Sequence, residues 1–434
     1  MSQFIMAGTS LLILFIIFVH ALFYRATVLA TPSCDGRRIH IRKLPRKFNT
    51  DILFKCSTVD PFSPNTCIHL RNSGLGPRTC NRSRSWYRTD HRFLEPFFHR
   101  RLLDYPCLVS DPSLADAVYL PYYAGLDALK FLHALEDDHE HYNRSVDHGK
   151  DLFDHLVRHQ SEIWGRRDGH DHFLVMSRPA WDFSQSPGEY MWGTSFLEIP
   201  EFFNVSALTL ESRSPAYQEH AVPYPTSFHP QNLFRLNRWI SRARISSRPN
   251  LMLFAGSGGG VNAAPNIRQS IRNECTDRGD LCEIVDCSKE KCEHNPMKYI
   301  KPMLNSKFCL HPSSDTSTRR GVFDGIIAGC VPVFFENSTA LSQYGWHLDE
   351  EDYKNFSVFI PKEDVVFGGL TLAKVLANIP LKKIAKMRER VLELVPRILY
   401  RRHGATVELT NIKDAFDLAI DGVLKKIKKR LGSI

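Results

Sequence analysis

The segment 306–335 is the part of the chain whose residue types and spacing most clearly suit chemistry. An apolar run is followed by a polar loop, and Arg319 and Arg320 stand directly before an apolar segment of helix length. The hydroxyl donors of this loop are Ser313, Ser314, Thr316, Ser317 and Thr318. The first turn of a helix presents unpaired N–H groups, and arginine binds phosphate oxygens bidentately, so the loop is a candidate diphosphate site. The alternative is an ordinary serine-rich turn that Thr318 caps.

Three titratable residues in the first half of the chain are candidates for a general base. In order of preference they are Asp182, Asp171 and His172, which lie at the ends of predicted strands beside aromatic residues. A hydroxyl that attacks an electrophilic carbon must lose its proton, and a carboxylate or imidazole within hydrogen-bond reach can accept it. For each residue taken singly, the competing interpretation is a cap or a surface side chain.

A glycine-rich turn, Gly256-Ser257-Gly258-Gly259-Gly260, follows a predicted strand, so the backbone at Gly256 could approach a ligand closely. It matches neither a Walker loop nor a dinucleotide fingerprint, and a flexible turn is the competing interpretation. The sequence contains no His-Glu-x-x-His and no Asp-x-Asp triplet. We therefore expect no metal site, with Arg319 and Arg320 supplying the positive charge instead.

The elements that must position these residues alternate regularly from residue 251 onward. The predicted strands are 251–255, 283–286, 308–310 and 331–335, and helices are predicted from 266, 297 and 320 and over 370–378, 381–400 and 411–431. This order predicts a parallel sheet covered on both faces, with ligands beyond the carboxyl ends of its strands. The first half is mixed α/β, with predicted strands 37–44, 117–123, 172–176 and 196–199 and helices 93–103 and 151–164.

The expected fold is therefore α/β, with two Rossmann-like domains and a cleft between them. The predicted divisions are an amino-terminal segment 1–30, a first domain 31–220, a proline-rich linker 221–250, a second domain 251–400, and a final helix with a basic tail 401–434. The formal charge of +9 is not spread evenly, because Lys425, Lys426, Lys428, Lys429 and Arg430 cluster in that tail. We interpret the tail as a solvated helix face that could touch anionic polysaccharide or membrane, and the lack of basic residues interleaved with aromatics argues against nucleic acid.

The segment Phe4–Tyr24 is apolar and long enough to span a bilayer. It predicts either a retained anchor or a signal peptide cleaved before Thr31, and both place the rest of the chain in a lumen. The count of positive charges flanking the segment argues for the opposite orientation. Eleven cysteines and five Asn-x-Ser/Thr sites outweigh that count. The candidate glycosylation sites are Asn81, Asn143, Asn204, Asn337 and Asn355.

The cysteines predict two disulfide frameworks, without a specified pairing. The first set is Cys34, Cys56, Cys67, Cys80 and Cys107, and the second is Cys275, Cys282, Cys287 and Cys292. Zinc held by the second set is the alternative, although the set lacks the paired Cys-x-x-Cys of a typical zinc site. Cys309 and Cys330 lie in apolar patterns and are predicted to be buried free thiols.

Five stretches of the sequence resemble the plant exostosin-like glycosyltransferases of family GT47, and within it the xyloglucan galactosyltransferases of the Katamari type. They are FFHRRLLDYPCLVSDPSLADAVYLPYYAGLD, DHFLVMSRPAWDF, VPYPTSFHP, SKFCLHPSSDTSTRRGVFDGIIAGCVPVFF and SVFIP. The resemblance implies a GT-B fold behind an uncleaved transmembrane anchor, in a type II Golgi membrane protein. It also implies an inverting, metal-independent transfer of β-galactose from UDP-galactose to the xylose side chains of xyloglucan.

Carried onto matching positions, the resemblance implies a set of donor-binding residues. They are Ser313, Asp315, Ser317, Thr318, Arg319, Arg320 and Asp324. Replacement of Arg320 by alanine is then expected to abolish transfer and leave the fold intact. Complexes with other Golgi glycosyltransferases are a further expectation. The alternatives are the same scaffold with UDP-galacturonic acid or UDP-arabinose as donor, and a non-catalytic protein that binds lumenal polysaccharide.

Overall fold

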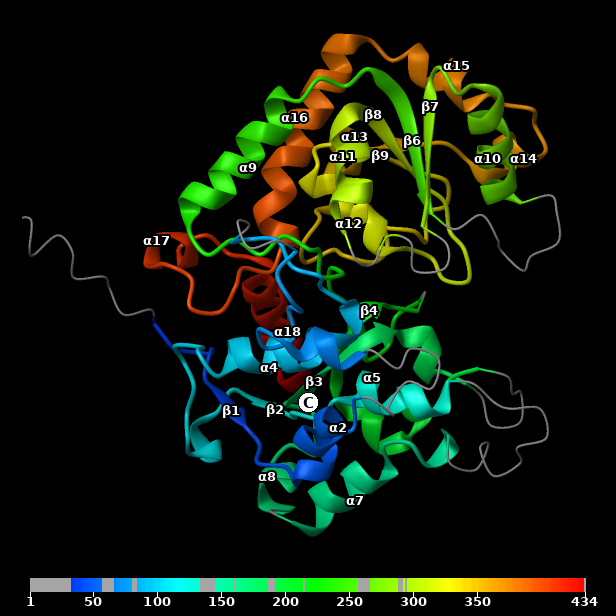
Figure 1. Ribbon diagram of the computed structural model, residues 1–434. Helices are drawn as coiled ribbons and strands as arrows, with labels where there is room; N and C mark the ends of the chain where they lie inside the picture. Colours follow the sequence, from blue (N-terminus) through cyan, green and yellow to red (C-terminus); the bar gives the residue numbers. More distant parts are fainter. Residues whose placement is uncertain are drawn as a thin grey trace, which may run out of the picture.

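The computed structural model describes residues 33–56, 66–79, 84–132, 145–159, 161–185, 192–213, 215–256, 266–287, 292 and 295–432. These residues form two five-stranded sheets, one in the lower and one in the upper half of Figure 1. The first has the order β1-β2-β3-β4-β5 and the second β10-β9-β8-β6-β7. Every neighbouring pair in both sheets is parallel, so the α/β fold with two parallel sheets is confirmed.

The observed strand bounds agree closely with the predicted ones in the second sheet and less closely in the first. The first sheet contains β1 Ile39–Ile41, β2 Ala117–Tyr119, β3 His172–Pro179, β4 Ser206–Glu211 and β5 Glu219–Ala221. The second contains β6 Asn250–Gly256, β7 Cys282–Asp286, β8 Ser306–His311, β9 Val331–Phe334 and β10 Val358–Phe359.

The helices cover both sheets. The helices that precede the second sheet in the sequence are α2 Thr50–Phe54, α4 Leu94–Leu102, α5 Ala124–Asp127, α7 Lys150–Arg158, α8 Ser161–Gly165 and α9 Leu233–Ile245. The others are α10 Ile267–Asp277, α11 Met297–Asn305, α12 Arg320–Ile327, α13 Tyr353–Phe356, α14 Lys362–Val366, α15 Leu372–Ala377, α16 Leu381–Ile398, α17 Val407–Thr410 and α18 Ala415–Leu431. Within the segment predicted as a linker, α9 packs against α16, and α18 returns to pack against β4.

The predicted strand 196–199 is wrong. Its apolar residues belong to a 3-10 helix, Phe196–Glu198, whose Phe196 is fully buried, and a second 3-10 helix begins at Pro200. A short apolar run cannot by itself distinguish a strand from a buried helical turn. The strand that pairs with β3 is β4, which is buried along its whole length. A search for apolar runs misses β4, because Ser206, Thr209 and Glu211 interrupt its apolar residues.

The disulfide frameworks are confirmed, and one prediction about the cysteines is wrong. The pairs are Cys34–Cys107, Cys56–Cys67, Cys275–Cys282, Cys287–Cys292 and Cys309–Cys330. Cys309 and Cys330 are therefore not free thiols: the parallel pairing of β8 with β9 brings their Cα atoms to 5.8 Å. Cys80 lies outside the described residues.

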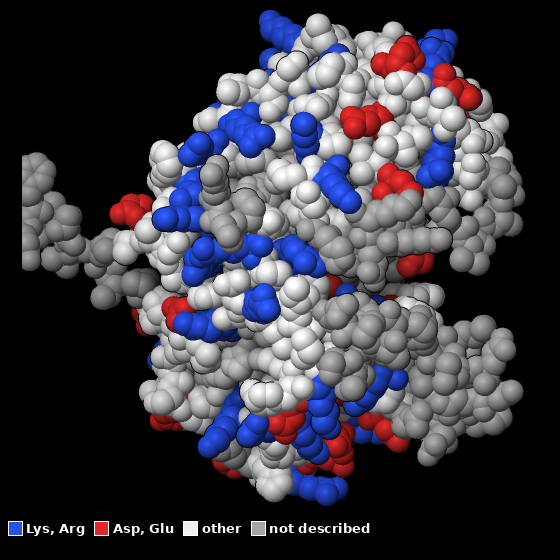
Figure 2. Space-filling model, in the orientation of Figure 1, with Lys and Arg blue, Asp and Glu red and all other residues white. Residues whose placement is uncertain are grey.

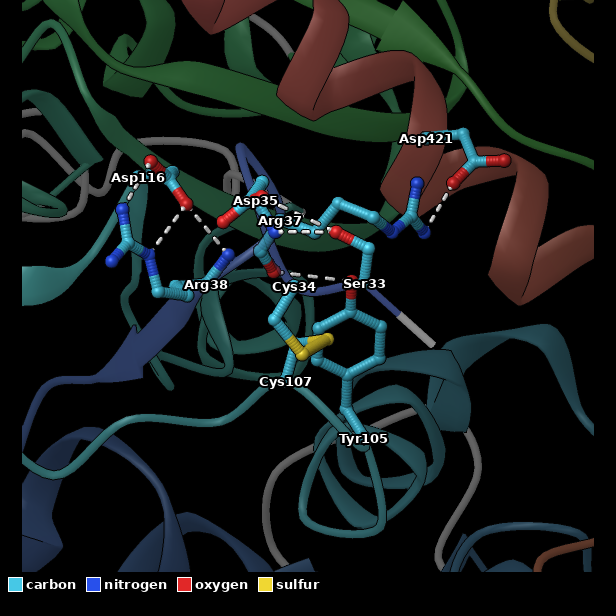
Figure 3. Close-up of a disulfide and its surroundings, with 9 residues drawn as sticks. All are labelled: Ser33, Cys34, Asp35, Arg37, Arg38, Tyr105, Cys107, Asp116 and Asp421. Carbon is cyan, nitrogen blue, oxygen red and sulfur yellow. Dashed lines mark hydrogen bonds and ion pairs between the residues drawn. A yellow bond between two sulfur atoms is a disulfide. The ribbon is translucent and has the colours of Figure 1, made fainter. Parts of the chain in front are cut away.

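The amino-terminal part of the described chain is fastened at several points (Figure 3). Cys34 is bonded to Cys107, and Arg37 pairs with Asp421 of α18. Arg38 pairs with Asp116 at 3.2 Å. The apolar segment Phe4–Tyr24 lies outside the described residues, and none of the helices within them is long and apolar enough to cross a membrane.

The candidate glycosylation sites differ in their surroundings. Asn337 and Asn355 are exposed, whereas Asn204 is partly buried and its side-chain amide donates to the carbonyl of Asp168 at 2.9 Å. Asn81 and Asn143 lie outside the described residues.

The basic residues of α18 only partly form a solvated face. Lys426 donates to the carbonyl of Gln218 at 2.7 Å, and Arg430 donates to the carbonyl of Asn204. These two side chains therefore fasten α18 to the first half of the chain. Other Lys and Arg side chains gather over α9, on the upper left of Figure 2.

Candidate active site

Two cavities lie between the carboxyl ends of the two sheets, where ligands of parallel sheets bind. The larger cavity has a volume of about 980 Å³ and the smaller about 680 Å³. Residues 312–319, which we call the donor loop, contribute to both, and Arg268 lines both as well. The two cavities thus meet at the loop that the sequence singled out.

The charge of the two cavities differs. The smaller cavity is lined by five arginines, Arg92, Arg178, Arg268, Arg319 and Arg320, against two acids, Asp90 and Asp324. The larger is lined by four acids, Glu198, Glu211, Asp315 and Glu336, against three bases, Arg213, Arg268 and Lys362. An anion such as a diphosphate is therefore favoured in the smaller cavity.

The donor loop leads from β8 into α12, as the sequence predicts. The residue at the amino-terminal cap of α12 is Arg319, and no side chain caps the helix there. The interpretation of the loop as a turn capped by Thr318 is therefore wrong. Arg319, Arg320 and Gly321 line the smaller cavity, so the amino end of α12 faces the arginine-rich space.

Arg319 is held by hydrogen bonds within its own loop and by an ion pair with Glu211 of β4 at 3.8 Å. Its guanidinium donates to the hydroxyl of Thr316, the carbonyl of Thr318 and the carboxylate of Asp315. About a third of its side chain, 34%, is exposed. These contacts keep a positive group at the mouth of the smaller cavity, in reach of an anionic ligand.

Arg320 reaches across to the first half of the chain. It donates to the carbonyl of Thr89, to the hydroxyl of Ser227 at 2.6 Å and to the hydroxyl of Tyr299 at 3.1 Å, and it pairs with Asp324 at 3.2 Å. Burial opposes its charge, but the nearby Tyr299, Asp324 and Asp90 outweigh burial and hold the pKa of Arg320 above its ordinary value. Arg320 therefore links the two halves of the chain and also lines the smaller cavity.

Glu211, at the carboxyl end of β4, holds the donor loop from the opposite sheet. Its carboxylate accepts hydrogen bonds from the hydroxyl of Thr316 at 2.8 Å, the backbone N–H of Thr318 at 3.0 Å and the hydroxyl of Tyr224 at 2.6 Å. Burial raises the pKa of Glu211, although the hydrogen bonds from these donors partly lower it. The sequence does not single out this residue, because its only local signal is its place at the end of a strand.

His91 is a titratable group of the smaller cavity that the sequence also does not single out. Its ring packs edge-on against Tyr224, with ring centres 5.5 Å apart, and its Nδ1 lies 3.8 Å from Asp90. Burial lowers the pKa of His91 to about 4, with Asp90 acting against this and Arg92, Arg178 and Arg320 adding to it. The imidazole is therefore neutral near neutral pH and able to accept a proton.

Two further residues line the smaller cavity, Asp324 on α12 and His311 at the end of β8. Burial raises the pKa of Asp324 to about 6 against the effect of Arg320, and it lowers the pKa of His311 to about 3. Gly256, at the end of β6, also lines this cavity; a Cβ added there would lie 2.9 Å from the guanidinium of Arg268. The glycines that follow, 258–260, lie outside the described residues.

The remaining loop residues face the larger cavity. Ser313, Asp315 and Ser317 line it, and the hydroxyl of Ser313 donates to Glu336 at 2.9 Å. Glu336 also pairs with Lys362 at 2.8 Å. The donor-binding residues expected from the sequence are thus brought together, but they divide between the two cavities.

The three bases nominated from the sequence line neither cavity. Asp182 is buried, and its two oxygens accept hydrogen bonds from Arg178 at 2.6 Å and from the indole of Trp192 at 2.7 Å. Asp171 and His172 are fully buried and bonded to each other at 2.7 Å at the amino end of β3, the edge remote from the ligand side of a parallel sheet. The structure therefore gives all three residues internal partners rather than a place at the cleft.

Comparison with known proteins agrees with the motifs in the sequence. Residues 33–376 match the Exostosin GT47 domain. The chain is 56% identical to "Probable xyloglucan galactosyltransferase GT19" of Arabidopsis thaliana, over 92% of each chain. It is 35% identical to "Xyloglucan galactosyltransferase XLT2" of the same plant, over 92% of this chain and 76% of that one. For "Xyloglucan galactosyltransferase MUR3", also from Arabidopsis thaliana, the identity is 36%, over 91% of this chain and 63% of that one.

The family match covers both sheets of the described structure. It ends at residue 376, one residue before the end of α15 at Ala377. It therefore includes the donor loop, Glu211 and His91 in one unit of sequence. The chain belongs to the exostosin GT47 family of glycosyltransferases.

Proposed function

We propose that this glycosyltransferase moves galactose from UDP-galactose to the xylose side chains of xyloglucan, with inversion at the anomeric carbon, on a GT-B architecture. The observation that carries nucleotide-sugar transfer is the arginine-rich cavity at the amino end of α12, between two parallel sheets. The names of the relatives GT19, XLT2 and MUR3 support galactose as the sugar and xyloglucan as the acceptor.

The proposed chemistry uses groups of the smaller cavity. The acceptor hydroxyl attacks the anomeric carbon, the bond from that carbon to the β-phosphate oxygen of UDP breaks, and UDP leaves as the anion. Arg319, Arg320 and the N–H groups of the first turn of α12 stabilise the negative charge that develops on the departing diphosphate. His91 accepts the proton of the attacking hydroxyl, and Asp90 stabilises the imidazolium that results.

His91 replaces Asp182 as the proposed base because of its position. It lines the cavity that holds the arginines, whereas Asp182 is buried with both carboxylate oxygens occupied. A neutral imidazole is the protonation state that a base requires, and the lowered pKa of His91 keeps it in that state.

The remaining expectations are also part of the proposal. The guanidinium groups supply positive charge where metal-dependent transferases use a cation, so we propose that transfer needs no metal. The apolar segment Phe4–Tyr24 is proposed to anchor the protein in the Golgi membrane in type II orientation, with the described domains in the lumen. Complexes with other Golgi glycosyltransferases are proposed as well.

The test is release of UDP by purified protein given a xyloglucan oligosaccharide and, separately, UDP-galactose, UDP-galacturonic acid, UDP-arabinose or UDP-glucose. We expect addition of one hexose from UDP-galactose alone, recorded by product mass, with activity retained in excess EDTA. Addition of another sugar would redirect the donor assignment. Glycan binding without UDP release from any donor would favour the non-catalytic alternative.

A further inference from the structure

The larger cavity differs from the smaller, arginine-rich cavity in the side chains that line it. Its walls carry two exposed aromatic side chains, Trp181 from the first half and Phe367 from the second. Trp181 is 58% exposed and Phe367 76% exposed. Large apolar side chains that remain exposed inside a concave surface usually mark a binding site.

The turn that carries Trp181 is built to present it. In the 3-10 helix Ala180–Phe183 the other three residues are buried, and Asp182 is held by Arg178 and Trp192. The backbone of Asp182 also accepts the N–H of Thr194 at 2.8 Å. A turn fixed in this way keeps the indole pointing outward, so its exposure is a property of a rigid scaffold.

The polar groups of the larger cavity suit hydroxyl groups rather than phosphate. Glu198 pairs with Arg213 at 2.6 Å on the first-half wall, and Glu336 pairs with Lys362 at 2.8 Å on the opposite wall. Paired carboxylates and cations offer acceptors and donors together, as a sugar hydroxyl requires. The excess of acids over bases in this cavity disfavours a second anion.

We propose that the larger cavity is the groove for the β-glucan backbone of the acceptor, with Trp181 and Phe367 as platforms for the apolar faces of its glucose rings. The inference rests on the proposed function for the identity of the glycan. A branched acceptor then lies beside the donor loop, and its side-chain xylose extends past that loop toward the smaller cavity. Trp181 and Phe367 thus determine acceptor affinity and touch no part of the donor.

The test compares Trp181→Ala and Phe367→Ala with Phe234→Ala in the full protein. Phe234 is a matched control, because it is 69% exposed on α9 and lines neither cavity. We take the loss of a central aromatic contact to weaken binding about tenfold, which is about 1.4 kcal/mol. We expect each cavity variant to raise the acceptor KM about tenfold, with the KM for UDP-galactose unchanged, and Trp181→Phe to recover most of the loss.

Two measurements separate this inference from the proposed function. Binding of xyloglucan oligosaccharides and of unbranched β-glucan oligosaccharides is followed by calorimetry, without any donor, beside the transfer assay. Wild-type transfer with an unchanged acceptor KM in both alanine variants would overturn the groove and leave the function standing. Absence of transfer in the wild type, with glucan binding that Trp181→Ala abolishes, would overturn the function and support the groove.

Discussion

Replacement of Arg320 by alanine is expected to weaken both the donor site and the fold. Only 21% of the side chain is exposed, and its loss leaves the buried carboxylate of Asp324 without its cation. Removing one partner of a buried ion pair costs about 3–5 kcal/mol. Each kcal/mol moves the Tm of a domain of 150–250 residues by about 2–4 °C, so the Tm should fall by about 6–20 °C. The expectation from the sequence, that this variant keeps an intact fold, takes no account of these contacts.

The assay is differential scanning calorimetry of the wild type and three variants, with UDP affinity measured in parallel. Arg319→Ala is the matched control, because its hydrogen bonds lie within its own loop and its one contact with the first half is a 3.8 Å ion pair with Glu211; it should weaken UDP binding and lower the Tm by less than about 4 °C. Adding Asp324→Asn to Arg320→Ala should recover much of the lost Tm, since no buried charge remains unpaired. An unchanged Tm in Arg320→Ala would refute the inference that the contacts of Arg320 stabilise the packing of the two halves.

The other predictions concern catalysis, acidity and the disulfides. His91→Gln should lower kcat by about 10²–10⁴-fold with unchanged UDP affinity, as single-turnover rates would record; a kcat within about twofold of wild type would exclude His91 as the base. Burial lowers the pKa values of His229 and His347 to about 4, below about 6.5 in the unfolded chain, so their contribution to stability is complete above pH 6.5 and is lost as the pH falls toward 4. Urea unfolding should therefore show a loss of about 2 kcal/mol for each of them between pH 7 and pH 5, and a flat profile would contradict this. The double variant Cys309→Ala, Cys330→Ala should have a free energy of unfolding about 3 kcal/mol below that of the wild type when both are measured under oxidising conditions. The reduced wild type, measured in parallel, should lose at least as much stability.

The sequence was most informative where function depends on neighbouring residues. The donor loop could be predicted because its hydroxyls, its arginines and the start of α12 follow one another along the chain. The regular order of strands and helices after residue 250 likewise predicted the second sheet, since βαβ units leave a local pattern.

The missed features depend on pairs that are distant in sequence. Glu211 meets Thr318 across 107 positions, and Cys309 meets Cys330 only because β8 and β9 are adjacent. His91 becomes a candidate base because the fold places it beside arginines from both halves of the chain. Conversely, Asp182 looked like a base because the sequence does not reveal that Arg178 and Trp192 occupy its oxygens.

The fastened amino-terminal end has a mechanical consequence. β1 is an edge strand of only three residues, and a pull along the preceding chain would otherwise break its ladder one hydrogen bond at a time. The Cys34–Cys107 bond passes such a force to the segment after α4, and the Arg37–Asp421 pair passes it to α18 (Figure 3). Both contacts lie before β1 in the chain, and the segment after α4 also pairs with β1 at Ile39 and Leu108, so tension on whatever precedes residue 33 is shared by β1, this segment and α18. A pull on that end therefore loads the Cys34–Cys107 bond and the Arg37–Asp421 pair before it reaches the hydrogen bonds of β1.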